Sequence, residues 1–242
     1  MIFLVLSLIV QVLLIVHCIK TGRNTIWIWV LALLSYAGII AYVAAELIPD
    51  LLRSRTAQRA GRNMKKVLDP NANLRRYENE ARVGGNVASL QRYAQELTRQ
   101  GRYDEAIAQY RKALTGLYEH DPNMMLGVAE AQFGKGDAPS ARQTLDELIR
   151  LNPDFRSPQG HLLYARALED EGNVTKALEE YKVLASSYPG AEAGARYAQL
   201  LKSQGQAEEA RRVAQEMLEA ARIAPEHYRR AQKEWLDIAE RI

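Results

Sequence analysis

The C-terminal two thirds of the chain repeat with a period of about 34 residues. Four glycines mark this period, Gly101, Gly136, Gly172 and Gly205, and they are separated by 35, 36 and 33 residues. Repetition at this spacing is typical of solenoids, in which each unit packs only on its neighbours. The repeat therefore limits this region to a stack of similar units.

Alanine occupies two fixed positions around each of these glycines. It stands seven residues before each glycine, at 94, 129, 165 and 198, and five residues after it, at 106, 141, 177 and 210. Two all-alanine columns on either side of a turn predict two helices that cross too closely for a larger side chain. Larger residues, such as Leu97, Leu168, Tyr110 and Tyr181, are predicted to fill the space around each crossing.

One repeat carries a recognisable helix sequence. The segment "GRYDEAIAQYRKAL" resembles the second helix of a tetratricopeptide repeat, and the prolines of "LNPD" and "SYPG" resemble the residue that ends that helix. The resemblance implies an all-α solenoid of about four units, each of two antiparallel helices, over residues 87–224. The fourth unit departs from the pattern, with Ala214 where an aromatic residue is usual and its proline displaced to Pro225.

Residues 225–242 are predicted to form one capping helix. Proline begins this segment, and Tyr228, Ala231, Trp235 and Ile238 fall on one helical face. The end of a solenoid needs a helix that covers its exposed apolar surface, so we expect this face to pack on the last repeat.

The first 49 residues predict a transmembrane helical hairpin. Residues 1–19 and 26–48 are apolar over the ~20 residues that a helix needs to cross ~30 Å of hydrocarbon, and only Lys20 and Arg23 are charged between them. A cleaved signal peptide is disfavoured because no basic residue precedes Lys20 and His17 stands just before Cys18. The segment resembles the two-helix membrane anchor of phospholipase D-type cardiolipin synthases at Gly22, Arg23, Trp27, Gly38 and Tyr42. That resemblance implies an anchor but no activity, since no histidine begins a His-x-Lys-x4-Asp motif.

Small and polar residues inside the predicted hairpin leave two interpretations open. Ser7, Gln11 and Cys18 recur on one side of the first span, and a strip of alanines, at 37, 41 and 45, runs along the second. Small residues let helices approach closely in a membrane. The strips would pack the hairpin on itself or join copies of it into a homo-oligomer.

Residues 50–86 are predicted to form a basic juxtamembrane helix, a break at Asp69-Pro70, a short helix and a hinge at Gly84-Gly85. Six basic residues follow the second span: Arg53, Arg55, Arg59, Arg62, Lys65 and Lys66. The positive-inside rule places them, and the repeats beyond them, in the cytoplasm. The same residues could contact anionic lipid headgroups. Taken together, the chain resembles a proteobacterial inner-membrane tetratricopeptide protein.

The sequence carries no motif for catalysis, metal binding or a cofactor, so we predict no enzymatic activity. A single cysteine, Cys18, excludes an intrachain disulfide and a Cys-based zinc site. Residues 87–242 hold fewer basic than acidic residues, which opposes contact with the phosphates of a nucleic acid.

A peptide-binding groove is the site that the family resemblance implies. Its lining lies two, three, six, ten and thirteen residues before each turn glycine. The selected residues are Gln91, Gln95, Arg99, Leu126, Glu130, Phe133, Arg166, Asp170, Glu192, Gln199 and Lys202. Phe133 offers an apolar anchor, while Gln91 and Gln95 replace the Lys and Asn that clamp a terminal carboxylate in chaperone-binding relatives.

These features predict an inner-membrane scaffold that holds a protein or peptide partner in a cytoplasmic groove. Two alternatives stay open. One is an oligomeric structural protein that uses the repeats as a spacer, and the other is a periplasm-facing scaffold for envelope assembly.

Overall fold

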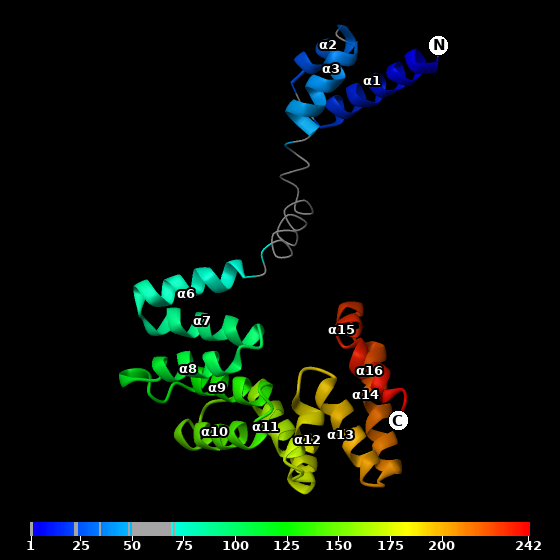
Figure 1. The fold of residues 1–242 in the computed structure, drawn as a ribbon. Coiled ribbons are helices and arrows are strands. Elements are labelled where there is room, and N and C mark those ends of the chain that lie inside the picture. The colour runs from blue at the N-terminus through cyan, green and yellow to red at the C-terminus, as the bar shows by residue number, and fades with distance from the viewer. Residues whose placement is uncertain (1, 22–23, 34, 48, 50–68, 70) are drawn as a thin grey trace. The chain divides into compact units, whose positions relative to one another are not determined.

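A computed structural model describes residues 2–21, 24–33, 35–47, 49, 69 and 71–242, and every regular element in these ranges is helical. The chain divides into two compact units, Met1–Ala72 and Asn73–Ile242 (Figure 1). The six basic residues predicted to lie at the membrane surface, at 53, 55, 59, 62, 65 and 66, fall outside the described residues.

The first unit contains α1 (Ile2–Lys20), α2 (Ile26–Leu33), α3 (Ser35–Tyr42) and the π-helix η1 (Val43–Leu47). The prediction of one continuous helix over residues 26–48 is wrong, because α2 and α3 are separate helices that pack on each other and on α1. Gly38 permits their close approach, since a Cβ there would clash with the Val30 carbonyl oxygen. Gln11 Nε2 donates a hydrogen bond of 2.9 Å to the Leu31 carbonyl, which lies in the last turn of α2. Within the described residues, no helix combines the length and apolar character needed to span a membrane.

The core of this unit agrees with the predicted helix contact at Gln11 and Cys18 of the first span but not at the alanines of the second. Cys18, Leu31 and Tyr42 are fully buried, and the Tyr42 hydroxyl lies 3.0 Å from His17 Nδ1. The strip of alanines at 37, 41 and 45 is exposed. These alanines therefore do not pack the hairpin on itself, and Gly38 and Tyr42 of the same helix make the internal contacts instead.

The C-terminal body, Asn73–Ile242, holds four helix pairs, which confirms the predicted solenoid. Each helix pair is called a repeat unit and is numbered from one to four. Unit one is α7 (Val87–Arg99) and α8 (Tyr103–Ala113), and unit two is α9 (Pro122–Gly134) and α10 (Ala138–Leu151). Unit three is α11 (Pro158–Asp170) and α12 (Val174–Ser187), and unit four is α13 (Glu192–Ser203) and α14 (Ala207–Ile223). A short 3₁₀ helix, η2 (Gly116–Tyr118), precedes α9. Figure 1 shows these helices stacked in chain order.

The turn glycines and the alanine columns take the positions that the repeat predicts. The four glycines have φ angles between 74° and 89°, a conformation in which a side chain would be strained. All eight alanines of the two columns are completely buried. Side-chain caps fix several helix starts: Asn86, Asp121, Asp137 and Ser157 each accept a backbone N–H of the first turn that follows.

Additional helices flank the repeats on both sides. α6 (Ala72–Gly84) confirms the predicted short helix and buries Leu74 and Ala81 in the core cluster that contains α7. The predicted single capping helix is instead α15 (Glu226–Ala231) followed by α16 (Lys233–Ala239). The two part at Gln232, whose side-chain oxygen accepts the Ala191 N–H at 2.9 Å and so ties the break to the start of α13. α16 packs on α13 and α14 and buries Ala239, as a cap requires.

The apolar core of the repeats is divided. One large cluster joins α6, α7, α8 and α9, and another joins α11 to α14 with α16. Between them lies a small cluster that buries only Ala129, Leu145 and Leu163. The interface between units two and three is therefore the least filled of the array.

Candidate functional site

The first helices of neighbouring units bring three of the predicted groove residues into contact. The Arg166 guanidinium of α11 lies 4.7 Å from the centre of the Phe133 ring of α9, within cation–π distance. The same guanidinium lies 3.7 Å from the Glu192 carboxylate of α13. Residues from units two, three and four thus form one continuous chain of contacts on this face.

Further charged residues extend this chain. Arg196 lies 2.9 Å from Glu192 and 3.8 Å from Glu169, and Tyr181 donates its hydroxyl hydrogen to Glu169 at 2.6 Å. Arg196 also lies over the Trp235 ring of α16, 5.2 Å from its centre. We call Phe133, Glu169, Arg166, Glu192 and Arg196 the groove network.

Sequence analysis missed Glu169, Arg196 and Trp235. Glu169 stands three residues before Gly172, as Phe133 and Lys202 stand three residues before their own glycines, so the spacing rule already contained it. Arg196 lies outside the spacing rule, and Trp235 was assigned only to the apolar face of the cap. Nothing in the repeat pattern predicts that these two side chains meet.

Burial and neighbouring charges shift the pKa values of Arg196, in the groove network, and of Tyr181 beside it. Arg196 is largely buried, which opposes its charge, yet its hydrogen bond to Glu192 and the field of Glu169 raise the pKa of the guanidinium. Desolvation and the hydrogen bond to Glu169 likewise raise the pKa of Tyr181. The Nε of Arg166 is buried without a hydrogen-bond partner among the described residues. Arg166 thus keeps one donor inside the protein without a partner among these residues.

Glu130 differs from Glu169 and Glu192, which both form ion pairs. It forms no ion pair within the described part of the chain, and it stands one helical turn before Phe133 on α9. Its side chain reaches the surface, but the surrounding protein excludes enough water to raise the pKa of the Glu130 carboxyl. An unpaired carboxylate in such surroundings attracts a cation.

The remaining predicted residues lie apart from the groove network. In unit one, Gln91 is half-buried, Gln95 is exposed, and Arg99 lies 3.6 Å from Glu96 of its own helix. Asp170 is exposed. Leu126 lines a cavity between units two and three.

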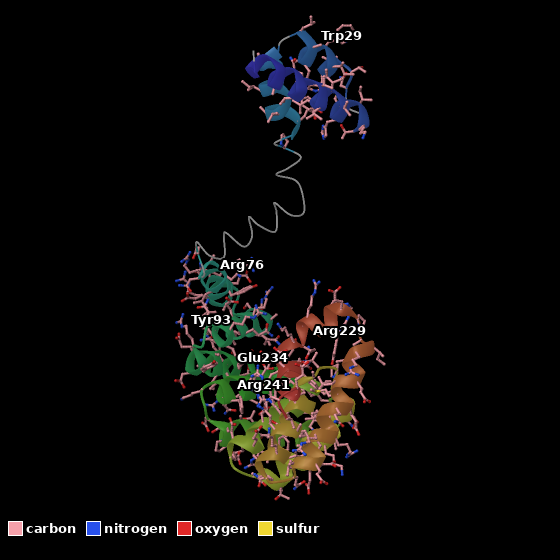
Figure 2. The ribbon with its side chains drawn as sticks, turned by 90° about the vertical axis from the view of Figure 1, so that its right-hand side faces the viewer. Trp29, Arg76, Tyr93, Arg229, Glu234 and Arg241 are labelled. Atoms are coloured by element: carbon pink, nitrogen blue, oxygen red, sulfur yellow. The ribbon has the colours of Figure 1, made fainter. Side chains whose placement is uncertain are left out.

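Gln199 and Lys202 border a shallow hollow between α13 and the end of the chain. Lys202 Nζ donates to the Arg241 carbonyl at 3.1 Å. Figure 2 shows the side chains of the C-terminal body and labels Glu234 and Arg241 near its C-terminus. The predicted groove therefore divides into a connected centre and isolated ends.

The described residues contain no cluster of His, Cys, Asp and Glu that could hold a metal ion. Aromatic residues and arginine are enriched at protein interfaces, and this face presents Phe133, Arg166 and Arg196.

Two tetratricopeptide repeat family models match the chain, over residues 97–167 and 160–191. Residues 97–191 are tetratricopeptide repeats. The fourth unit lies beyond these matches, yet its turn glycine and its two alanines share the geometry of the other units.

Solved structures of low sequence identity share the fold of the helical repeats. MamA is 20% identical with a TM-score of 0.52, and the match covers 60% of this chain and 85% of MamA. A thermophilic tetratricopeptide protein of Thermus thermophilus is 21% identical with a TM-score of 0.51, over 74% of this chain and 96% of that one. YrrB, a tetratricopeptide protein with an unusual peptide-binding site, is 16% identical with a TM-score of 0.52, over 74% and 90%. No curated protein sequence matches this chain.

Proposed function

We propose that this protein is a membrane-anchored adaptor whose tetratricopeptide groove binds a segment of a partner protein. The observation that carries the proposal is the contact chain from Phe133 through Arg166 to Glu192, which joins three units across one face. Tetratricopeptide arrays are generally scaffolds, and the peptide-binding site of YrrB supports the same use of a similar fold.

The groove network selects the chemistry of the partner. The Phe133 ring supplies an apolar surface, the Arg166 side chain is about one third exposed, and Glu130 has no ion-pair partner among the described residues. A partner segment with an apolar residue between an acidic and a basic residue would meet all three. In unit one, Gln91 and Gln95 stand where a carboxylate clamp would need Lys and Asn, so the partner's C-terminal carboxylate is not the feature recognised.

Replacing both Phe133 and Arg166 by alanine tests this proposal. The full-length double variant should lose partners that co-purify with the wild-type protein after cross-linking in cells, because a few central residues carry most binding energy. The matched control is Gln143→Ala, an exposed residue on the second helix of unit two. Identical sets of partners for all three proteins would contradict a role for the groove.

The anchoring part of the proposal rests on the N-terminal body, Met1–Ala72. Large apolar side chains of α1, α2 and α3 are exposed on it, including Leu13 at 62%, Trp29 at 68% and Ile40 at 69%. Apolar surface of this extent favours burial in lipid or against another protein. Anchoring would raise the effective concentration of the groove near a membrane-bound partner, so that a modest affinity suffices.

The orientation in a bacterial inner membrane is a separate proposal. The basic residues from Arg53 to Lys66 favour the cytoplasmic side for the repeats and could contact anionic lipids. A reporter active only in the cytoplasm and one active only in the periplasm, each fused after Ile242, test it. Activity of the periplasmic reporter would support the envelope-scaffold alternative.

An oligomeric anchor is a second candidate because the alanines at 37, 41 and 45 are exposed together on α3 and η1. Such a strip would let helices of two copies approach closely in lipid. Ala41→Leu should weaken the oligomer in mass measurements of the protein in detergent, whereas a monomeric wild-type protein would exclude this role.

A further inference from the structure

A cavity of about 630 Å³ opens between units two and three. Leu145 and Leu148 of α10, Tyr164 of α11, Leu184 of α12 and Phe155 of the connecting loop contribute to its wall. The groove network lies elsewhere, and Leu126 is the one predicted groove residue among the lining residues. Cavities of this size and apolar character are typical of ligand sites.

Two adjacent residues explain why the cavity exists. At the start of α9, Met124 and Met125 are both buried, with 2% and 5% of their surfaces exposed. Met124 belongs to the core cluster that joins α9 to unit one, and the Met125 sulfur lies 4.0 Å from Asn152 Nδ2. The equivalent residues of α11, counted back from the turn glycine, are Gly160 and His161. Gly160 has no side chain, and His161 pairs with Glu180 at 2.6 Å.

The last interface of the array shows that small residues here need not leave a cavity. The equivalent residues of α13 are Ala193 and Gly194. Met217 of α14 fills that space, since its sulfur lies 3.1 Å from where a Gly194 Cβ would be. Leucine occupies the position equivalent to Met217 in unit three, at Leu184, and it lies on the cavity wall. Only the interface between units two and three therefore lacks a compensating side chain among the described interfaces.

Charged residues at the cavity differ in how they are paired. Asp146 accepts hydrogen bonds from Arg142 and Tyr164, at 2.6 and 3.0 Å. Arg156 donates to the Pro153 carbonyl at 2.5 Å. Glu180 has His161 as its partner and no lysine or arginine within ion-pair distance in the described part of the chain. A cation that enters the cavity mouth would thus be attracted first to Glu180.

We propose that this cavity binds a bulky apolar side chain of a partner protein, next to a basic residue that pairs with Glu180. The apolar side chain takes the place of the buried methionine at the equivalent position of α9. The flanking basic residue supplies the cation that the Glu180 carboxylate lacks.

Three short peptides test the chemistry of this site on the full-length protein in detergent. Acetyl-Lys-Trp-Lys-amide should shift the methyl NMR signals of Leu145 and Leu184, and it should bind at least about tenfold more tightly than acetyl-Glu-Trp-Glu-amide. Acetyl-Lys-Gly-Lys-amide should leave these signals unchanged. Equal binding of the acidic peptide, binding of the glycine peptide, or no shift with any peptide would overturn the proposal.

Two variants test the site itself. His161→Met introduces the residue that is buried at the equivalent position of α9, Met125, and should fill the cavity. The melting temperature should therefore rise by roughly 2–4 °C while binding of the Lys-Trp-Lys peptide falls at least about tenfold. The raised melting temperature would show that lost binding does not come from unfolding. Glu180→Gln should keep binding of the tryptophan peptides but remove the preference for lysine over glutamate. Unchanged peptide binding by His161→Met, or an unchanged preference in Glu180→Gln, would overturn the proposal.

Discussion

Thr144 donates its hydroxyl hydrogen to the side-chain oxygen of Gln132 at 2.7 Å. Gln132 is buried, with 7% of its surface exposed, at the position that leucine occupies in the other three units. The bond therefore satisfies a polar group that the repeat pattern would make apolar. It explains how unit two tolerates glutamine in its core.

A double-mutant cycle should expose the dependence of Gln132 on Thr144. Thr144→Val leaves a buried amide oxygen without a donor and should lower the free energy of unfolding by about 1–2 kcal/mol. Gln132→Leu combined with Thr144→Val should restore wild-type stability, because neither polar group then remains. Urea unfolding followed by circular dichroism measures both changes, and a double variant less stable than Thr144→Val would contradict this account.

Glycine substitutions should separate backbone strain from steric clash. Gly172 has φ 76° and open space around its Cβ position, so Gly172→Ala should cost about 1 kcal/mol through backbone conformation alone. A Cβ at Gly127 would instead clash with the Tyr110 ring, and Gly127→Ala should cost about 2 kcal/mol or more. Thermal unfolding ranks the two, and the reverse order would refute the assignment.

Gln232→Ala should loosen the cap without unfolding the array. The variant removes the side-chain acceptor of the Ala191 N–H, at a cost of about 1 kcal/mol. Hydrogen exchange at Ala191 and along α16 should accelerate, while exchange in α7 and α8 stays at the wild-type rate. Gln204→Ala, which changes an exposed glutamine of the adjacent turn, serves as the control.

Glu130 should make stability depend on pH in a defined direction. Its pKa in the folded protein lies above the ordinary value of 4.5, so the folded state binds the proton more tightly than the unfolded state. The penalty for ionising Glu130 is absent below about pH 4.5 and grows as the pH rises through the higher, folded-state pKa.

Glu130→Gln should therefore raise the free energy of unfolding at pH 7, by less than about 1 kcal/mol because the side chain is exposed. At pH 4 the variant and the wild type should be equally stable. Glu219→Gln, an exposed acid on α14, is the control. A larger difference at pH 4 than at pH 7 would contradict the direction of the shift.

The exposed Trp29 reports on the proposed anchor. A chain with Trp27→Phe and Trp235→Phe retains Trp29 alone, and brominated lipids should quench its fluorescence more than about twofold if it lies at the level of the headgroups. The matched chain with Trp27→Phe and Trp29→Phe retains Trp235 in the C-terminal body and should not be quenched. Equal quenching of the two chains would argue against insertion of the N-terminal body, Met1–Ala72, into the lipid.

The repeat architecture could be predicted because a helix crossing tolerates only a narrow range of side-chain volume. Alanine at two fixed positions and a glycine that needs positive φ leave a repeated, local signal. The same register selects Phe133, Arg166 and Glu192 among the groove residues, although it does not predict that they contact one another. Each of these predictions depends only on spacing within one unit.

Features set by contacts between distant residues could not be predicted in this way. Gln232 ends α15 by bonding to Ala191, a residue far from it in sequence. Gly38 lets α2 fold against α3 within a stretch whose uniform apolar composition predicted one helix. The cavity depends on a comparison between interfaces, since Ala193 and Gly194 are equally small but Met217 compensates for them.

The divided core also has a mechanical consequence. In a solenoid each unit contacts only its neighbours, so the least well packed interface takes up most of an applied bend. Here that interface lies between units two and three, where the apolar core is thinnest. The Phe133–Arg166 contact bridges the same interface on the groove side. Bending there would change the distance between the Phe133 ring and the Arg166 guanidinium. A change in the curvature of the array would therefore also change the shape of its binding face.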